Sequence, residues 1–235
     1  MQLFYIAELN ESSTDIAFDK IESRHIIKVL RKKEGDLITI TNGKNLLFKS
    51  EITSANEKKC QVRILSVTQE KSTCNYSLQI AIAPTKSNDR FEWFLEKATE
   101  IGIDAVYPII STNSERKVIK TERLKKVLLS AMKQSLHYQL PILHELHSFK
   151  EFVNQDFKGQ KFIAHCEKTN KKSLKSLLQP NTNVTILIGP EGDFSTDEIA
   201  LALQNGFIPV SLGATRLRTE TAGIVATHSV AFVNE

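Results

Sequence analysis

Several features of membrane, secreted and metal-binding proteins are missing from this 235-residue chain. No run approaches the roughly 20 apolar residues that a membrane-spanning helix needs, and the first residues lack the basic and apolar regions of a signal peptide. The three cysteines, Cys60, Cys74 and Cys166, lie far apart and lack the spacing of metal ligands. We therefore expect free thiols in a reducing cytoplasm, no membrane segment and no bound metal.

The excess of positive charge is also small. With 31 Lys and Arg against 27 Asp and Glu, the formal net charge is +4, which does not by itself establish a polyanionic partner. The distribution is more informative, because residues 111–135 hold seven basic side chains and only two acidic ones. Such a patch can neutralise several phosphates of RNA, although a solvated face of a lysine-rich helix explains it equally well.

The N-terminal third reads as short strands. Leu37–Ile40 and Leu46–Ile52 flank Asn42-Gly43, a dipeptide that tolerates the positive φ angles of a tight hairpin turn. A third strand is expected over Gln61–Val67, and one helix over Glu22–Leu30 interrupts the series. Short strands in a small unit indicate a compact barrel.

The polar stretch 69–73 is expected to be a linker, and the predicted strands alternate with helices after it. Strands are expected over residues 78–83, 105–110, 161–166, 184–188 and 207–212, and helices over 89–101, 121–139, 196–204 and a final segment reaching residue 232. Strands that alternate with helices of this length imply crossover connections and a mostly parallel sheet. The sequence therefore predicts two domains, 1–72 and 73–235.

Two of these helices carry signals at their ends. Ser195 is placed to cap the helix over 196–204 while Glu198 reaches back, and Asn205-Gly206 closes it. Thr219 or Thr221 is the expected cap of the last helix.

Two loops follow predicted strands at the positions where open α/β sheets bind ligands. Residues 189–192 read Gly-Pro-Glu-Gly, and Leu212-Gly213 begins the second loop. Glycine lets the backbone approach a flat ligand closely, and Pro190 stiffens the first loop. Neither loop has the glycine pattern of a phosphate cradle, so a nucleoside ligand without a pyrophosphate would suit them. A tight strand-to-helix turn is the structural alternative for the first loop.

The second loop is harder to explain as a turn. Arg216 and Arg218 lie beside a glycine loop and are followed by Glu220 and the small residues Ala222 and Gly223. Paired arginines at such a place are typical of nucleotide or carboxylate binding.

Residues 188–192 (Ile-Gly-Pro-Glu-Gly) and 217–222 (Leu-Arg-Thr-Glu-Thr-Ala) resemble the two signature segments of the RsmE family. These are SPOUT-class enzymes that use S-adenosylmethionine to methylate N3 of a uridine in the decoding region of 16S ribosomal RNA. Further residues that resemble family positions are His25 with Val29-Leu30-Arg31, then Lys86, Arg90, Lys97, Glu100 and Gly102, then Ala131, Gln134, Ser135 and Pro141. The resemblance covers nearly the whole chain.

The resemblance implies an α/β fold in which a small PUA-like barrel that binds RNA precedes a SPOUT domain with a parallel sheet and a deep trefoil knot. It also implies a cytoplasmic homodimer that acts on the 30S subunit. A non-catalytic ribosome-assembly factor and a SPOUT enzyme with another RNA target are the alternatives.

Two departures from the family pattern stand out. The family often reads Gly-Pro-Glu-Gly-Gly, whereas Asp193 is the fifth residue here. It also commonly carries an arginine shortly after Gln-Ser, where this chain has Leu136-His137-Tyr138.

The same resemblance assigns roles to individual residues. The expected cofactor contacts are Leu187, Ile188, Gly189, Glu191, Gly192, Leu212, Gly213, Leu217, Arg218, Thr221 and Ala222. The expected RNA contacts are His25, Arg31, Lys86, Arg90, Lys97, Arg116, Arg123 and Gln134. Arg218 is the candidate to stabilise negative charge on the uracil, and Glu191, Glu220 or solvent accepts the N3 proton. Trp93, on the same helix side as Arg90 and Lys97, either stacks on a base or packs at the edge of the core. His144 and His147 lack a third metal ligand, and His165 and His228 are expected to be structural.

Overall fold

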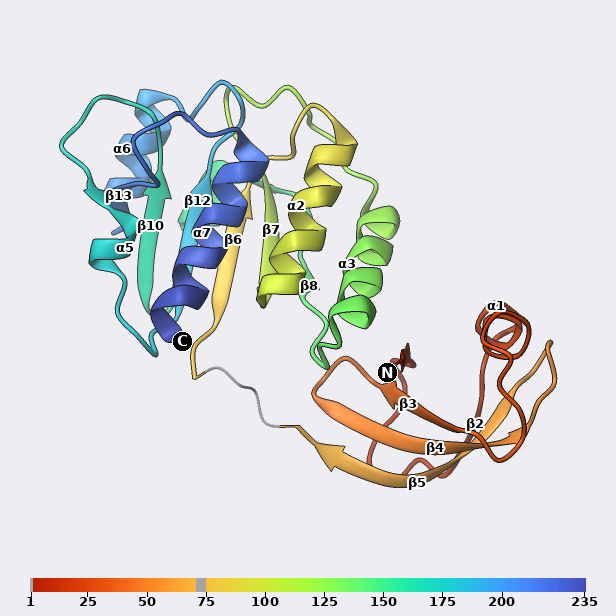
Figure 1. The fold of residues 1–235 in the computed structure, drawn as a ribbon. Coiled ribbons are helices and arrows are strands. Elements are labelled where there is room, and N and C mark those ends of the chain that lie inside the picture. The colour runs from red at the N-terminus through yellow and green to blue at the C-terminus, as the bar shows by residue number, and fades with distance from the viewer. Residues whose placement is uncertain (1, 71–74) are drawn as a thin grey trace. The chain divides into compact units, whose positions relative to one another are not determined.

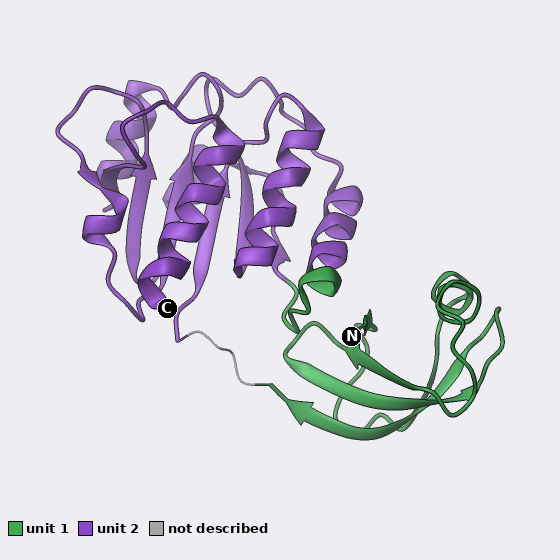
Figure 2. Ribbon diagram, in the orientation of Figure 1, with its two compact units in different colours: residues 1–72, 132–140 green, residues 73–131, 141–235 purple. Residues whose placement is uncertain are grey.

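A computed structural model describes residues 2–70 and 75–235, which form two compact units (Figures 1 and 2). One unit comprises the first 72 residues together with Met132–Leu140, and the other comprises the remainder of the chain. The expected linker over 69–73 falls largely outside the described residues, as do the predicted domain boundary and Cys74.

The N-terminal unit is built on a five-stranded sheet in the order β1-β3-β4-β5-β2. The strands are β1 (Leu3–Tyr5), β2 (Asp15–Ala17), β3 (Leu37–Thr41), β4 (Leu46–Ser54) and β5 (Gln61–Gln69). The β1–β3 pair is parallel and the other pairs are antiparallel. The three longer strands confirm the sequence prediction, whereas β1 and β2 were not predicted because three residues are too few to show an alternating pattern.

The turn between β3 and β4 is longer than the predicted dipeptide. Four residues connect the strands, and both Gly43 and Asn45 have positive φ angles of 73° and 62°. The Asn42 side chain accepts a hydrogen bond from the Lys44 amide at 2.9 Å. An Asx-type contact of this kind stabilises the turn locally.

The predicted helix begins as α1 (Lys20–Arg24) and continues as a π-helical turn over His25–Val29. Its end is marked by Arg31, whose φ of 55° lies in the left-handed region that usually holds glycine. The Lys32 amide donates to the Ile26 carbonyl at 3.1 Å across this turn. Ile26 is fully buried and packs into the core of the unit with Phe4, Ile40 and Phe48.

The larger unit contains a parallel sheet in the order β11-β13-β10-β12-β6-β7-β8, with β9 paired to β7. The strands are β6 (Leu78–Ile82), β7 (Ala105–Ile110), β8 (Ile142–Leu143), β9 (His147–Ser148), β10 (Gln160–Ala164), β11 (Lys172–Ser173), β12 (Val184–Ile188) and β13 (Ile208–Ser211). Every pair in it is parallel. The five predicted strands are confirmed, whereas the two-residue strands were not predicted.

Six helices accompany this sheet among the described residues: α2 (Asn88–Ile101), α3 (Thr121–Ser135), α4 (Phe149–Val153), α5 (Leu174–Leu177), α6 (Thr196–Gln204) and α7 (Thr219–Asn234). Helix α7 packs against α2 on one face of the sheet (Figure 1), and α4 packs against α6. The contact between α7 and α2 is so close that a Cβ on Gly223 would lie 2.6 Å from the Phe94 ring.

Four helix ends test the sequence prediction. The capping box of Ser195 and Glu198 and the end of α6 at Asn205 are confirmed. Helix α3 was predicted to reach residue 139 but ends at Ser135, because Leu136 adopts a left-handed φ of 58°. The prediction that Thr219 or Thr221 caps α7 is wrong, since the N-cap residue is Arg218 and its side chain forms no capping hydrogen bond.

These features confirm the predicted fold class of a small strand-rich unit and a parallel α/β unit, while the trefoil knot stays a prediction. Within residues 2–70 and 75–235, none of the helices combines the length and the apolar character needed to cross a membrane.

Candidate functional site

Two adjoining cavities lie at the carboxyl ends of β10, β12 and β13, with volumes of about 260 and 400 Å³. The smaller one borders the Gly189–Asp193 loop, and the larger one borders the loop from Leu212 to Leu217. Both are lined by Ala164, Cys166, Arg216, Leu217 and Ala222. The two loops that the sequence singled out therefore meet at one divided pocket, as parallel-sheet topology predicts.

The first loop is fixed to the start of α7. Thr219 is buried, and its hydroxyl donates to the Gly189 carbonyl at 3.0 Å. This contact explains why Thr219 does not cap its own helix. A Cβ on Gly189 would lie 3.2 Å from the Phe194 ring, so the loop has little room for a side chain at this position.

Asp193, the departure from the family pattern, completes the same loop. Its φ of 65° is left-handed, a conformation that aspartate tolerates better than most residues. One carboxylate oxygen accepts from the Cys166 amide at 2.6 Å and the other from the Phe194 amide at 2.9 Å. The Asn113 amide nitrogen donates to the Gly192 and Asp193 carbonyls at 3.2 and 3.1 Å. Asp193 thus ties the end of β10 to the first loop.

Glu191 lines the smaller cavity, and only one of its two carboxylate oxygens accepts a hydrogen bond from a described residue. Its Oε1 accepts from the Lys86 amide at 3.0 Å, whereas Oε2 is buried and has no hydrogen-bond partner among the described residues. Arg116 holds the Lys86 segment in turn, because its guanidinium donates to the Thr85 carbonyl at 2.9 Å and to the Lys86 carbonyl. A buried acceptor without a donor is suited to a ligand that brings one.

The two arginines of the second loop differ in their contacts. Arg216 donates to the Glu191 carbonyl at 3.2 Å. Arg218 is exposed and lines the smaller cavity, and its side chain forms no hydrogen bond or ion pair with any described residue. Its guanidinium is therefore available to an anionic group in the pocket.

Glu220 lies outside both cavity walls. It is 5% exposed, and its Oε1 is 3.7 Å from the Arg90 Nε. From the sequence, Glu220 and Glu191 were equal candidates for the proton acceptor. Of the two, only Glu191 lines the pocket.

Most of the predicted cofactor contacts come together around the pocket. The residues that line it are Ile188, Gly189, Glu191, Leu212, Gly213, Leu217, Arg218 and Ala222. Leu187 is instead fully buried in the core, Gly192 packs beside Asn113, and Thr221 lies outside both walls. Sequence reasoning missed Ala164, His165, Cys166 and Lys171, although the end of a parallel strand is itself a signal for ligand contact.

Comparisons with known proteins agree with this geometry. A family model described as an RNA methyltransferase domain matches residues 72–231, and one described as an RNA methyltransferase PUA domain matches residues 18–65. The first match covers well over half of the chain. The chain belongs to the RNA methyltransferase family.

Relatives of this methyltransferase match most or all of its length. The Ribosomal RNA small subunit methyltransferase E of Bacillus subtilis is 27% identical, over 91% of this chain and 88% of that protein. A crystal structure of a probable rRNA-methyltransferase from Porphyromonas gingivalis is 38% identical, covers 100% of this chain and 98% of that one, and has a TM-score of 0.93. Ribosomal RNA small subunit methyltransferase E from Neisseria gonorrhoeae, solved bound to S-adenosyl methionine, is 26% identical over 100% and 98% of the two chains, with a TM-score of 0.84.

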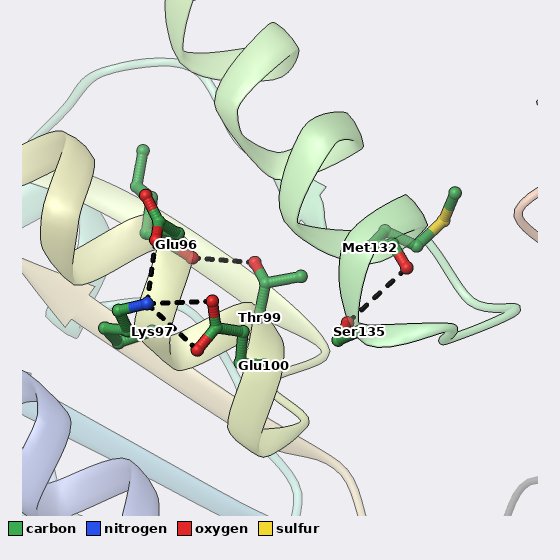
Figure 3. Close-up of polar contacts among 7 residues, drawn as sticks. Glu96, Lys97, Thr99, Glu100, Met132 and Ser135 are labelled. Atoms are coloured by element: carbon green, nitrogen blue, oxygen red, sulfur yellow. Dashed lines mark hydrogen bonds and ion pairs between the residues drawn. The ribbon is translucent and has the colours of Figure 1, made fainter. Parts of the chain in front are cut away.

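The basic residues that the sequence proposed as RNA contacts of the methyltransferase domain all have partners within the protein. Lys86 pairs with Glu115 at 2.8 Å, Arg123 with Glu92 at 2.6 Å, and Arg90 with Glu220. Lys97 donates to Glu96 and Glu100 on its own helix at 2.7 and 2.9 Å (Figure 3), and these hydrogen bonds raise its pKa. The positive charge of these side chains therefore does not by itself indicate contact with RNA.

In the N-terminal unit of the methyltransferase, Arg31 and Gln134 are exposed, while His25 is half-buried with its ring against Phe4. Trp93 on α2 is 46% exposed, which leaves its ring available to a partner.

The histidines do not form a metal site. Throughout the described ranges there is no group of three or more His, Cys, Asp or Glu residues that could hold a metal ion. His144 stacks on Tyr107 with the ring centroids 3.7 Å apart, and burial lowers the pKa of His144. His228 is exposed, so its place in an apolar stretch did not predict burial. Cys60 is a buried free thiol and Cys166 an exposed one.

Proposed function

We propose that this methyltransferase transfers the methyl group of S-adenosylmethionine to N3 of a uridine in the decoding region of 16S ribosomal RNA, on the assembled 30S subunit in the cytoplasm. The observation that carries the proposal is the position of Arg218, an unpartnered guanidinium in the wall of a pocket built from two strand-end loops. The names of the relatives support the substrate class, and the S-adenosyl methionine bound to one of them supports the cofactor.

The pocket residues fit such a cofactor. Small and apolar side chains, among them Ala164, Val210, Leu217 and Ala222, suit the flat ring of a nucleoside. The unpartnered Oε2 of Glu191 gives the pocket one open acceptor, which either a donor group of the cofactor or the imide proton of the uracil can occupy. When bound, S-adenosylmethionine supplies an electrophilic methyl group on a sulfonium.

The protein's part in the reaction is to prepare the uracil. N3 is an imide nitrogen and a poor nucleophile until its proton leaves, and the resulting negative charge spreads onto the neighbouring carbonyl oxygens. Arg218 would stabilise that charge through its guanidinium. Glu191 would accept the proton because its second oxygen is free. Glu220 would act only indirectly, since it lies outside the pocket and pairs with Arg90. Positioning of the reactants would supply most of the remaining acceleration, about 7–11 kcal/mol in favourable cases.

Binding of ribosomal RNA belongs to the same proposal. The PUA-like domain, which we place within residues 1–72, would contact RNA through His25 and Arg31, and Gln134 would add a contact. In the domain of residues 73–235, five basic side chains would contact RNA only through donor groups that their internal partners leave free. These residues are Lys86, Arg90, Lys97, Arg116 and Arg123.

We also propose a homodimer. Trp93 on α2 and Phe232 on α7 are 46% and 53% exposed, and the two helices that carry them pack together. Exposed aromatic side chains on neighbouring helices are suited to a subunit contact. Sedimentation equilibrium should give twice the chain mass of 26.5 kDa; a monomer mass would refute this part of the proposal.

The decisive experiment is transfer of labelled methyl from S-adenosylmethionine to purified 30S subunits, followed by nucleoside analysis. Label in 3-methyluridine of 16S RNA supports the reaction, the cofactor and the substrate class together. Label in another nucleoside or another RNA would refute the target, and failure to bind the cofactor at all would favour an assembly factor without catalytic activity. Naked 16S RNA in a parallel reaction tests whether the assembled particle is required.

A further inference from the structure

His165 lies in the wall of the larger cavity and has no role in the function described so far. It follows β10 directly and is 8% exposed. Across the cavity from this strand end runs the loop of residues 212–217, whose apolar members include Leu212 and Leu217. A titratable ring that is almost completely buried at a ligand pocket needs a physical explanation.

Lys171 fixes the tautomer of this histidine. The Lys171 ammonium donates to the His165 and Glu167 carbonyls, both at 2.6 Å, and lies 3.4 Å from the His165 Nδ1. An ammonium group has only hydrogens to offer, so Nδ1 must be the acceptor and the ring proton must sit on Nε2. Burial and then the charge of Lys171 lower the pKa of His165, against the opposing effect of Asp193 and Glu167, so the ring favours the neutral form.

The Nε2–H that results has no partner. Nε2 is buried and forms no hydrogen bond with any described residue. An unsatisfied buried donor is unfavourable, and a binding site can retain one because the ligand supplies the acceptor. Lys171 is not an alternative donor, because its ammonium already has three acceptors within the loop.

The surroundings indicate which kind of acceptor fits. The positive charge of Lys171 and the negative charges of Asp193 and Glu167 act on the ring in opposite directions, so an uncharged acceptor fits this mixed environment. The cavity wall around His165 includes Ala164, Val210 and Ala222, which favour an aromatic ring over a charged chain.

We propose that His165 is a cofactor-recognition residue whose Nε2–H donates a hydrogen bond to an uncharged acceptor, a ring nitrogen or a ribose oxygen, on the nucleoside part of the cofactor. Lys171 acts as a positioning residue that keeps the proton on Nε2. This inference rests on the proposed function in one respect, namely that a nucleoside cofactor occupies the pocket.

The first test is nitrogen NMR of the histidine rings in the full-length wild-type protein. A His165→Gln variant assigns the His165 signals by their disappearance. The free protein should show the Nε2–H tautomer, and addition of S-adenosylhomocysteine should shift the Nε2 proton downfield as its hydrogen bond forms. Unchanged ring signals on saturation with ligand would overturn the proposal without any mutation that affects folding.

The second test is calorimetric titration with two probes, adenosine and S-adenosylhomocysteine. His165→Leu should weaken the binding of both by the same factor, roughly 10-fold for one lost hydrogen bond to a buried donor. His165→Gln, whose amide nitrogen can reach the Nε2 position, should restore most of the affinity. Lys171→Met should weaken binding less and should populate the Nδ1–H tautomer in the NMR spectrum.

The outcomes separate this inference from the proposed function. Equal losses for the two probes support the nucleoside contact, whereas a loss confined to S-adenosylhomocysteine would place the contact on the amino-acid part and overturn it. Wild-type protein that binds both probes, together with a His165→Leu variant of equal affinity, overturns only the role of His165. Wild-type protein that binds neither probe overturns the cofactor assignment as well.

Discussion

Two loops of the methyltransferase domain each carry an arginine, and the two side chains have different contacts. In the loop of residues 212–218, Arg218 reaches the pocket wall and has no partner among the described residues. In the loop of residues 111–120, Arg116 binds two backbone carbonyls of the β6–α2 connection. A basic residue is therefore available to a ligand only where the fold leaves its donors unsatisfied.

The internally bound arginine still contributes to the site. Arg116 fixes the segment whose Lys86 amide donates to Glu191, so it stabilises the position of Glu191 indirectly. The free arginine can contribute directly to charge stabilisation because no internal partner must first be displaced. Substitution of Arg218 and of Arg116 tests this distinction directly.

The largest effect is expected for Arg218→Ala. Loss of the guanidinium should lower kcat for methyl transfer roughly 100- to 1000-fold, the usual effect of removing one donor from a developing negative charge. Thermal unfolding should stay close to that of the wild type, because the side chain has no described internal partner. Strong residual activity would show that the Arg218 guanidinium is not needed for methyl transfer, although no internal partner occupies it.

Arg116→Ala should act mainly on stability. Two carbonyls lose a charged donor, so the free energy of unfolding should fall by roughly 1.5–3 kcal/mol, as measured by urea denaturation. Lys117→Ala is the matched control, since Lys117 is exposed and should change stability by less than about 0.5 kcal/mol. If Arg116→Ala instead leaves stability unchanged and reduces the salt dependence of RNA binding, Arg116 is an RNA contact.

Arg31→Gly should affect stability and RNA binding in opposite directions. Glycine removes the cost of a left-handed side-chain residue, so the free energy of unfolding should rise by about 0.5–1 kcal/mol. Loss of the charge should at the same time weaken binding to 30S subunits and reduce the salt slope by about one unit. Arg31→Asn, which also tolerates this conformation, is the control for charge alone; RNA binding that matches the wild type in both variants would refute the contact.

The smallest effect concerns the buried histidines and pH. The pKa of His144 is lowered in the folded protein by burial and by His147, so the unfolded chain takes up a proton first as the pH falls. The stability that depends on the neutral ring is therefore complete above the ordinary value of 6.5 and is lost as the pH falls below it. His144→Phe keeps a ring against Tyr107 and should flatten the decline in melting temperature between pH 7 and pH 5. An unchanged decline would show that other groups cause it; His165, whose pKa is also lowered, would be the first to test.

Much of this protein could be predicted from its sequence, for reasons that are local. The strand β12 (Val184–Ile188), the helix α6 and its capping box were all predicted at their observed positions, because apolar pattern and capping chemistry act over a few residues. The two glycine-containing loops were predicted to form a site because parallel strands bring their carboxyl ends to one edge.

Other features depended on contacts between distant parts of the chain. Thr219 looked like a helix cap, but its hydroxyl binds the Gly189 carbonyl thirty residues away. Asp193 departs from the family pattern, and its carboxylate binds the Cys166 amide, which comes from the end of another strand. Sequence pattern cannot reveal such bonds, because each partner is supplied by a different element.

Local sequence pattern predicts the longer strands and helices and the position of the two pocket loops, but not the short elements β1, β2, β8, β9, β11, α4 and α5. The packing of distant segments selects which charged side chains are free: it separates Arg218 from Arg116 and Glu191 from Glu220, and it brings His165 to the pocket. The physical reason is that periodicity and capping are properties of neighbouring residues, whereas the partner of a charged or buried polar group is chosen when distant segments pack together.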